Sequence, residues 1–343
     1  MNLADLNKVA NKMVEPGKGI LAADESSGTI KKRFESIKIE STEEKRRDYR
    51  EMLFRTPSFG EYISGVILYD ETIKQKAADG TPLPKIIENA GAVPGIKVDS
   101  GTKPLPFCPD EVITEGLDGL RDRLKAYYEL GARFAKWRAV IDVGRAGNRA
   151  IPSYACVATN ANALARYAAL CQEAQIVPIV EPEILMDGDH DIERCYQATE
   201  MTLKFVFEQL YLQRVALEGI VLKPNMVIAG KTSAKQASIQ EVAEKTIKCL
   251  KACVPALVPG IAFLSGGQSD EEATAHLNAM NAIGGLPWKL TFSYGRALQA
   301  APLRVWAGNN ANNSKAQAAF AHRAKMNGLA SLGKWQQSLE KAA

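Results

Sequence analysis

Gly219-Ile-Val-Leu-Lys-Pro-Asn-Met226 predicts a short buried strand that ends on a lysine. Pro224 cannot donate to a sheet, so strand pairing should stop there. A lysine in this place either extends to solvent or serves as an amine. Because burial of an ammonium is costly, a buried lysine tends to release its proton, and a neutral amine can form a Schiff base with a carbonyl. The segment alone leaves both interpretations open.

Seven other short apolar runs carry a polar or charged residue at their carboxyl ends. They are Gly19-Ile-Leu-Ala-Ala-Asp24, Gly65-Val-Ile-Leu-Tyr69, Gly95-Ile-Lys-Val-Asp99, Phe134-Ala-Lys-Trp-Arg138, Ile176-Val-Pro-Ile-Val-Glu181, Ile261-Ala-Phe-Leu-Ser265 and Leu290-Thr-Phe-Ser293. Helical patterns separate them, and Ser41-x-x-Glu44, Ser238-x-x-Glu241 and Ser269-x-x-Glu272 have the spacing of capping boxes.

Eight strands that alternate with helices predict an α/β protein with a (β/α)8 TIM barrel. We expect a single domain over residues 1–343, with an N-terminal helix within 1–18 and a C-terminal helical region at 303–343. The alternative is an open doubly wound sheet. That fold would favour a G-x-G-x-x-G first turn, which the sequence does not contain.

Composition narrows the functional classes. The 343 residues are 46% hydrophobic and 24% charged with a net charge of +4, which suits a folded soluble protein and small anionic ligands. No block of like charge suggests nucleic acid, and no apolar run is long enough to span a membrane. Six cysteines without a Cys-x-x-Cys pair, and an amphipathic N-terminus instead of a signal peptide, predict a cytoplasmic protein. Three scattered histidines argue against a histidine-rich metal site.

In a parallel barrel the carboxyl ends of the strands surround one site. The residues expected to converge there are Asp24, Lys97, Asp99, Lys136, Arg138, Glu181, Glu183, Lys223, Ser265 and Ser293. Lys136 and Arg138 should share a face because strand side chains alternate. The cations would disfavour an ammonium on Lys223, and the two glutamates offer an acid/base pair. The alternative is a structural network of salt bridges.

The last two strands end in glycine-containing loops that precede helices. These loops are Leu264-Ser-Gly-Gly-Gln-Ser269 and Ser293-Tyr-Gly-Arg296. Glycines and helix N-termini present free N–H groups to anions, and the loops after strands seven and eight are the usual phosphate site of this barrel. Arg296 adds a bidentate donor. A phosphorylated substrate is therefore expected.

Asp187-Gly-Asp-His-Asp191 could instead hold a divalent metal. The segment lacks the spacing of an EF-hand, and acidic residues are common where helices begin. We therefore favour helix capping and expect no metal.

Over nearly its whole length, the chain resembles the class I fructose-bisphosphate aldolases. The resemblance rests on Gly17-Lys-Gly-Ile-Leu-Ala-Ala-Asp-Glu-Ser26, Phe134-Ala-Lys-Trp-Arg138, Val177-Pro-Ile-Val-Glu-Pro-Glu-Ile-Leu185, Leu222-Lys-Pro-Asn-Met226, Leu264-Ser-Gly-Gly-Gln-Ser269 and Thr291-Phe-Ser-Tyr-Gly-Arg-Ala-Leu-Gln299. It implies reversible cleavage of fructose 1,6-bisphosphate to dihydroxyacetone phosphate and glyceraldehyde 3-phosphate, in glycolysis or gluconeogenesis, without a cofactor. It also implies a homotetramer.

The resemblance assigns roles to fourteen residues. Lys223 would form the Schiff base, Glu181 would be the acid/base with Glu183 and Lys136 beside it, and Asp24 would assist carbon–carbon cleavage. The ketone-half phosphate would be held by Ser265, Gly266, Gly267, Ser293, Gly295 and Arg296. The aldehyde-half phosphate would be held or oriented by Arg33, Lys97 and Arg138. A different Schiff-base lyase or transaldolase, and a non-catalytic scaffold that binds partner proteins, remain as rivals.

The sequence departs from better-known family members at its end, Ser338-Leu-Glu-Lys-Ala-Ala343. In those members a longer tail that finishes in tyrosine reaches the active site and favours the bisphosphate. We therefore expect only a modest preference for fructose 1,6-bisphosphate over fructose 1-phosphate. Steady-state assays on both sugars measure it, and a preference of many hundredfold would contradict the expectation.

Overall fold

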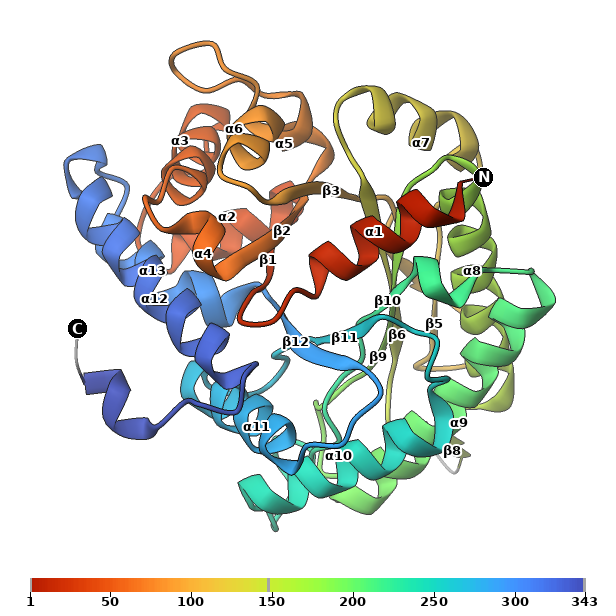
Figure 1. The fold of residues 1–343 in the computed structure, drawn as a ribbon. Coiled ribbons are helices and arrows are strands. Elements are labelled where there is room, and N and C mark those ends of the chain that lie inside the picture. Colours follow the sequence, from red (N-terminus) through yellow and green to blue (C-terminus); the bar gives the residue numbers. More distant parts are fainter. Residues whose placement is uncertain (1, 147–148, 342–343) are drawn as a thin grey trace.

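The structure is a computed structural model that describes residues 2–146 and 149–341. Within these residues, eight parallel strands close into a barrel in the order β1-β12-β11-β10-β9-β6-β3-β2, which confirms the predicted TIM barrel and rules out the open sheet (Figure 1). The strands are β1 (Gly19–Ala23), β2 (Ile63–Leu68), β3 (Val93–Lys97), β6 (Phe134–Ile141), β9 (Val177–Ile184), β10 (Val221–Leu222), β11 (Gly260–Phe263) and β12 (Lys289–Tyr294). Each falls on one of the eight apolar runs.

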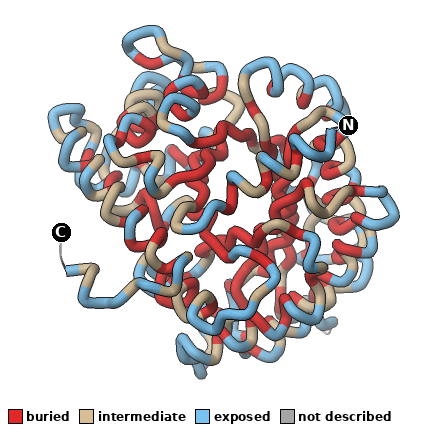
Figure 2. Tube along the Cα trace, in the orientation of Figure 1, coloured by how far each residue is buried: buried red, intermediate tan, exposed pale blue. Residues whose placement is uncertain are grey.

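Helices surround the barrel, and burial is concentrated on the strands and on the inner faces of the helices (Figure 2). The α-helices are α1 (Leu3–Met13), α2 (Ser27–Glu35), α3 (Glu43–Phe54), α4 (Phe59–Tyr62), α5 (Asp70–Lys74), α6 (Leu83–Asn89), α7 (Leu120–Glu129), α8 (Tyr154–Glu173), α9 (Ile192–Leu212), α10 (Ile239–Cys253), α11 (Asp270–Ile283), α12 (Arg296–Trp306) and α13 (Asn313–Ala330). Short 3-10 turns are η1 (Leu217–Gly219), η2 (Asn310–Asn312) and η3 (Gln337–Lys341).

The strand register brings the charged residues together. β6 pairs with β9 so that Arg138 lies opposite Glu181, and β3 pairs with β6 so that Lys97 lies opposite Lys136. Lys223 directly follows β10, and its backbone N–H still donates to the carbonyl of Val180 at 2.8 Å. The backbone ladder therefore fixes the starting point of each of these side chains.

Helix α1 closes the end of the barrel at which the strands begin, and it lies across this end in Figure 1. Its Leu6, Ala10 and Met13 belong to one buried cluster with residues near the amino ends of the strands, such as Phe134 and Val177. Apolar side chains fill this end of the barrel. The polar side chains therefore lie at the end where the strands finish.

The structure also contains two antiparallel hairpins that the apolar runs do not reveal. β4 (Thr102–Pro104) pairs with β5 (Val112–Thr114), and β7 (Gly144–Ala146) pairs with β8 (Arg149–Ile151). These strands are only three residues long, too short for a periodic signal. The predicted terminal regions include Met1 and residues 342–343, which lie outside the described residues, and the single-domain assignment stays a prediction.

The capping predictions have mixed outcomes. Ser269 and Glu272 form a reciprocal capping box at α11, and Ser238 caps α10. The box at Ser41 is wrong, because Thr42 caps α3 by accepting the N–H of Lys45. Both residues can cap, and the chain path rather than the spacing selects between them.

Gly95 on β3 allows the barrel interior to close around a phenylalanine. A Cβ at this position would lie 2.3 Å from the ring of the fully buried Phe134. We expect Gly95→Ala to lower the free energy of unfolding by about 1–3 kcal/mol through overpacking. Denaturant unfolding measures this.

Gly28→Ala is the control, because a Cβ there meets nothing within 4 Å. Alanine also favours helix α2, so this variant should be neutral or slightly more stable. Equal effects of the two substitutions would contradict the packing argument.

Candidate active site

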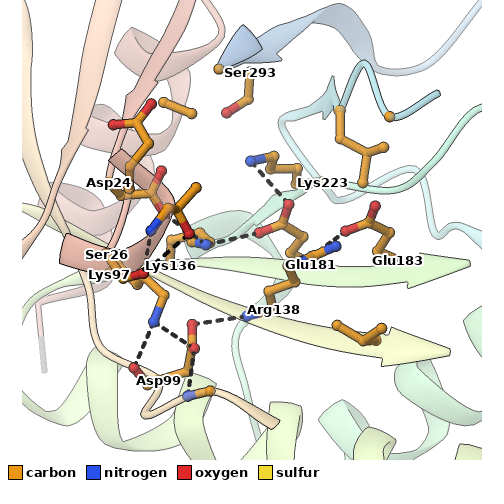
Figure 3. A pocket seen from close by; sticks show the side chains of 18 of the residues that line it. Asp24, Ser26, Lys97, Asp99, Lys136, Arg138, Glu181, Glu183, Lys223 and Ser293 are labelled. Carbon is orange, nitrogen blue, oxygen red and sulfur yellow. Dashed lines mark hydrogen bonds and ion pairs between the residues drawn. The ribbon is translucent and has the colours of Figure 1, made fainter. Parts of the chain in front are cut away.

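A cavity of about 720 Å³ opens at the carboxyl ends of the strands, a size that suits a small ligand (Figure 3). Thirteen of the fourteen predicted site residues line it. They are Asp24, Arg33, Lys97, Lys136, Arg138, Glu181, Glu183, Lys223, Ser265, Gly266, Ser293, Gly295 and Arg296. Gly267 is the exception, since it is not among the lining residues.

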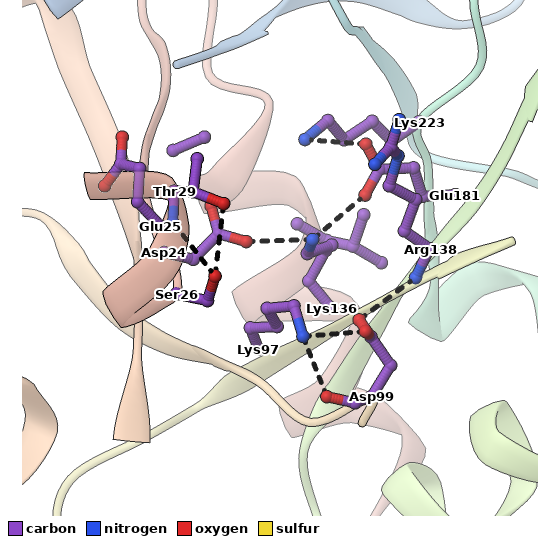
Figure 4. A network of polar contacts seen from close by, with 12 residues as sticks. Asp24, Glu25, Ser26, Thr29, Lys97, Asp99, Lys136, Arg138, Glu181 and Lys223 are labelled. Atoms are coloured by element: carbon purple, nitrogen blue, oxygen red, sulfur yellow. Dashed lines mark hydrogen bonds and ion pairs between the residues drawn. The ribbon is translucent and has the colours of Figure 1, made fainter. Parts of the chain in front are cut away.

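Four side chains form what we call the charge row: the partly buried Asp24 and the buried Lys136, Glu181 and Lys223 (Figure 4). Lys223 Nζ lies 3.0 Å from Glu181 Oε1. Lys136 Nζ lies 3.4 Å from Glu181 Oε2 and 2.8 Å from Asp24 Oδ2. Two carboxyl and two amino side chains thus alternate along the row. Lys223 faces a carboxylate directly, so a proton acceptor is in place beside its amine.

Contacts within the row hold Asp24 and Lys136 ionised. Burial opposes the charged form of Asp24, but Lys136 and Lys223 outweigh burial and lower the pKa of Asp24 to about 2. Burial likewise acts to lower the pKa of Lys136, but Asp24 and Glu181 outweigh it and raise that pKa above its ordinary value. Lys136 is therefore a fixed cation, and Asp24 is a fixed anion at neutral pH.

Two further ion pairs adjoin the charge row: Arg138 with Glu183 beside Glu181, and Lys97 with Asp99 below the row (Figure 3). Arg138 Nε donates to Glu183, which raises the pKa of Arg138 against the effect of its burial. Lys97 Nζ lies 2.7 Å from Asp99 Oδ1 and donates to the backbone carbonyl of Asp99 at 2.8 Å. Lys97 and Arg138 are therefore already oriented before any ligand arrives.

The two glycine-containing loops line another part of the cavity. The hydroxyl of Ser293 is buried without a partner, so it is available to a ligand. Arg296 Nη1 lies 3.0 Å from Asp270 Oδ1, and its Nη2 donates to the carbonyl of Gln268. Gly267 has a φ of +76°, which lets the loop turn behind Gly266 into the helix α11. Gly267 thus shapes the loop without lining the cavity.

Arg33 belongs to this glycine-rich end. Its Nη2 lies 3.4 Å from the position that a Cβ on Gly295 would occupy, and its Nη1 donates to Glu25. The resemblance instead assigns Arg33, together with Lys97 and Arg138, to the aldehyde half of the substrate.

Sequence reasoning also missed some lining residues, among them Glu25, Ser26, Thr29 and Tyr69. Ser26 caps α2 and lies two residues after Asp24, a spacing that could have revealed it. Glu25 carried no such signal.

The acidic segment after β9 serves the helix, as predicted. Asp191 caps α9 by accepting the N–H of Arg194 at 2.8 Å, and Asp187 pairs with Lys231. Within the described residues, no group of three or more His, Cys, Asp and Glu side chains is placed to hold a metal ion. Over the same residues, none of the helices combines the length and apolar character that a membrane crossing requires.

Comparison with known proteins agrees with this geometry. The family described as fructose-bisphosphate aldolase class-I matches residues 5–343. The chain belongs to this family. A probable fructose-bisphosphate aldolase class 1 of Xanthomonas campestris pv. campestris is 59% identical over 337 residues, covering 98% of this chain and all of that protein.

Two further relatives extend the comparison. The cytosolic fructose-bisphosphate aldolase 4 of Arabidopsis thaliana is 54% identical and covers 93% of this chain and 80% of that protein. The Plasmodium falciparum aldolase, solved in complex with TRAP and a small-molecule inhibitor, has a TM-score of 0.95 and 49% identity, covering 97% and 96% of the two chains. These matches confirm the resemblance to class I aldolases. The relatives are all named fructose-bisphosphate aldolase, which is a lyase.

The pKa of Asp24 leads to a prediction for stability. A lowered carboxyl pKa stabilises the fold above the unfolded value of about 4, and this contribution is lost as the pH falls toward about 2. Asp24→Asn should therefore destabilise the protein at neutral pH, and its deficit relative to the wild type should shrink below about pH 4. Denaturant unfolding at several pH values measures both quantities.

Asp122→Asn is the matched control, because Asp122 is exposed on α7 and its substitution should have little effect at any pH. A deficit for Asp24→Asn that does not change with pH would contradict the charge-row argument.

Proposed function

We propose that this protein cleaves fructose 1,6-bisphosphate reversibly to dihydroxyacetone phosphate and glyceraldehyde 3-phosphate through a Schiff base on Lys223. The observation that carries the proposal is a buried lysine amine 3.0 Å from a buried carboxylate, in a cavity lined with cations at the catalytic end of the barrel. Family membership supports the substrate, and the contacts of Lys223 support the mechanism.

The first step is formation of the Schiff base. The ammonium of Lys223 passes a proton to Glu181, and the lone pair of the resulting amine attacks the substrate ketone carbon. A proton then moves from the nitrogen to the former ketone oxygen, which gives the carbinolamine. The carbinolamine loses its hydroxyl as water when Glu181 returns a proton. Lys136 stays charged beside Glu181 and stabilises whichever oxyanion forms.

The second step breaks the carbon–carbon bond. The iminium accepts the electron pair of the neighbouring carbon–carbon bond as that bond breaks. The iminium thereby becomes an enamine, and the aldehyde half departs. The hydroxyl proton of that half passes to the charge row, where Asp24 and Glu181 are the two carboxylates. Protonation and hydrolysis of the enamine then release the ketone.

The phosphates would be bound at separate places. Ser265, Gly266, Ser293, Gly295 and Arg296 provide hydroxyls, N–H groups and a guanidinium for the ketone-half phosphate. The position of Arg33 beside Gly295 supports its addition to this group. Lys97 and Arg138 remain for the aldehyde half, with Glu183 and Asp99 orienting them.

The proposal also covers the cellular location, the number of subunits, the pathway and the absence of other ligands. A cytoplasmic location is supported by the plant relative that is named cytosolic. A homotetramer, a place in glycolysis or gluconeogenesis, and the independence from cofactors, nucleic acid and membranes are proposed from family membership. A transaldolase or a scaffold is disfavoured because neither requires cations for a second phosphate around a buried lysine.

Borohydride reduction with dihydroxyacetone phosphate tests the proposal. The adduct should fall on the peptide that contains Lys223, and Lys223→Met should fold normally while turnover drops by several orders of magnitude. Peptide mass mapping and a coupled cleavage assay measure these outcomes. A chelator should leave the activity unchanged.

Lys231→Met is the control, because Lys231 is partly exposed and pairs with Asp187 outside the cavity. It should retain both trapping and turnover. An adduct on another lysine, or near-normal turnover in Lys223→Met, would reject the assignment.

A further inference from the structure

Arg50 on α3 is a buried arginine that the proposed chemistry does not use. Its side chain is 1% exposed and does not line the cavity. Nη2 donates to the backbone carbonyl of Glu25 at 2.9 Å and lies 3.8 Å from the Glu25 carboxylate. Nε and Nη1 are buried without hydrogen-bond partners, although Nη1 lies 4.0 Å from Glu71. A guanidinium buried at such cost and only partly satisfied is a poor device for stability.

Glu25 joins Arg50 to the cavity. The side chain of Glu25 is 4% exposed, and its Oε1 accepts from Arg33 and, at 2.8 Å, from Gln299 Nε2. Gln299 is itself anchored to the carbonyl of Ala22 at 2.7 Å. The carboxylate is therefore held by the buried Gln299 and lies 3.8 Å from the buried Arg50, while its partner Arg33 lines the cavity.

Arg50, Glu25 and Arg33 form what we call the arginine–glutamate row, which runs from the core to the glycine-rich end of the cavity. The exposed fraction of the side chain rises from 1% at Arg50 to 24% at Arg33. With Arg33 alone, the Glu25 carboxylate would cancel most of its attraction for an anion. A second cation shares that carboxylate and leaves a net positive charge facing Gly295.

We propose that Arg50 is a positioning residue for the ketone-half phosphate: through Glu25 it orients Arg33 and preserves the charge of Arg33 for the phosphate. This inference rests on the proposed function, because it assumes a phosphorylated ketone at that end. It makes Arg50 a determinant of substrate affinity although its atoms never touch the substrate.

A purely structural role makes a different prediction. If Arg50 only stabilised the fold, its substitution would lower the unfolding temperature and leave the kinetics of the folded fraction unchanged. If it acts through Glu25 on Arg33, KM rises in molecules that are fully folded. A comparison of the change in KM with the change in kcat therefore distinguishes the positioning role from the purely structural role.

The experiment compares Arg50→Met and Arg50→Lys with Arg46→Met. Arg46 lies one turn earlier on α3 and binds Glu71 and Ser41, none of which lines the cavity. KM for fructose 1,6-bisphosphate should rise about tenfold in Arg50→Met, with kcat within about threefold of the wild type. Arg50→Lys keeps the charge and should show a smaller rise, and Arg46→Met should show none.

Fructose 1-phosphate carries only the ketone-half phosphate, so its KM should rise by the same factor. A double-mutant cycle completes the test: in an Arg33→Lys background, Arg50→Met should change KM by less than about twofold, because the orienting path is already broken. Thermal melts of every variant identify any that do not fold, and if Arg50→Met is one of them, Arg50→Lys decides the question.

Unchanged KM values in folded Arg50 variants, an effect equal to that of Arg46→Met, additivity in the cycle, or a rise confined to the bisphosphate would each overturn the inference. The proposed function fails separately, since that failure would appear as absence of aldol cleavage in the wild type. An active wild type with indifferent Arg50 variants would leave the function intact and reject only the role of Arg50.

Discussion

The alternation of acidic and basic side chains from Asp24 through Lys136 and Glu181 to Lys223 is the interaction on which the site depends. Each of the four side chains is tolerated in the barrel only because its neighbours have the opposite charge, and removal of one leaves another unpaired in a poorly solvated place. The same arrangement supplies the chemistry. It puts a proton acceptor against the amine of Lys223 and a permanent cation between the two carboxylates, so structure and reactivity share one cause.

The barrel makes this alternation possible. Parallel strands end at one rim, and their register sets Arg138 opposite Glu181 and Lys97 opposite Lys136. Helix α1 fills the other rim with apolar side chains, so the polar residues have a single mouth to occupy. Beyond the charge row, pairs such as Arg138 with Glu183 and Arg33 with Glu25 follow the same principle, in which a carboxylate fixes a cation that a phosphate can later engage.

Much of the fold and the site could be predicted from the chain. The eight apolar runs coincide with the eight barrel strands, and thirteen of the fourteen predicted residues line the cavity. The failures have physical causes. The two hairpins have strands of three residues, which carry no periodicity. Ser41 and Thr42 are both competent caps, and only the path of the chain selects Thr42. Gly267 turns the loop and does not line the cavity. The sequence alone does not show whether a glycine serves a turn or a binding site.

The sequence by itself determined which residue types stand at the strand ends, because apolar patterning and proline positions act locally along the chain. Only the tertiary structure decided which charges pair. Arg33 is grouped with Gly295, and Arg50 reaches Glu25 from a helix that no motif linked to the site. The reason is that an ion pair depends on distances of a few ångströms between segments far apart in sequence. Closure of the barrel and packing of α3 against α6 and α13 set those distances, and no local pattern records them.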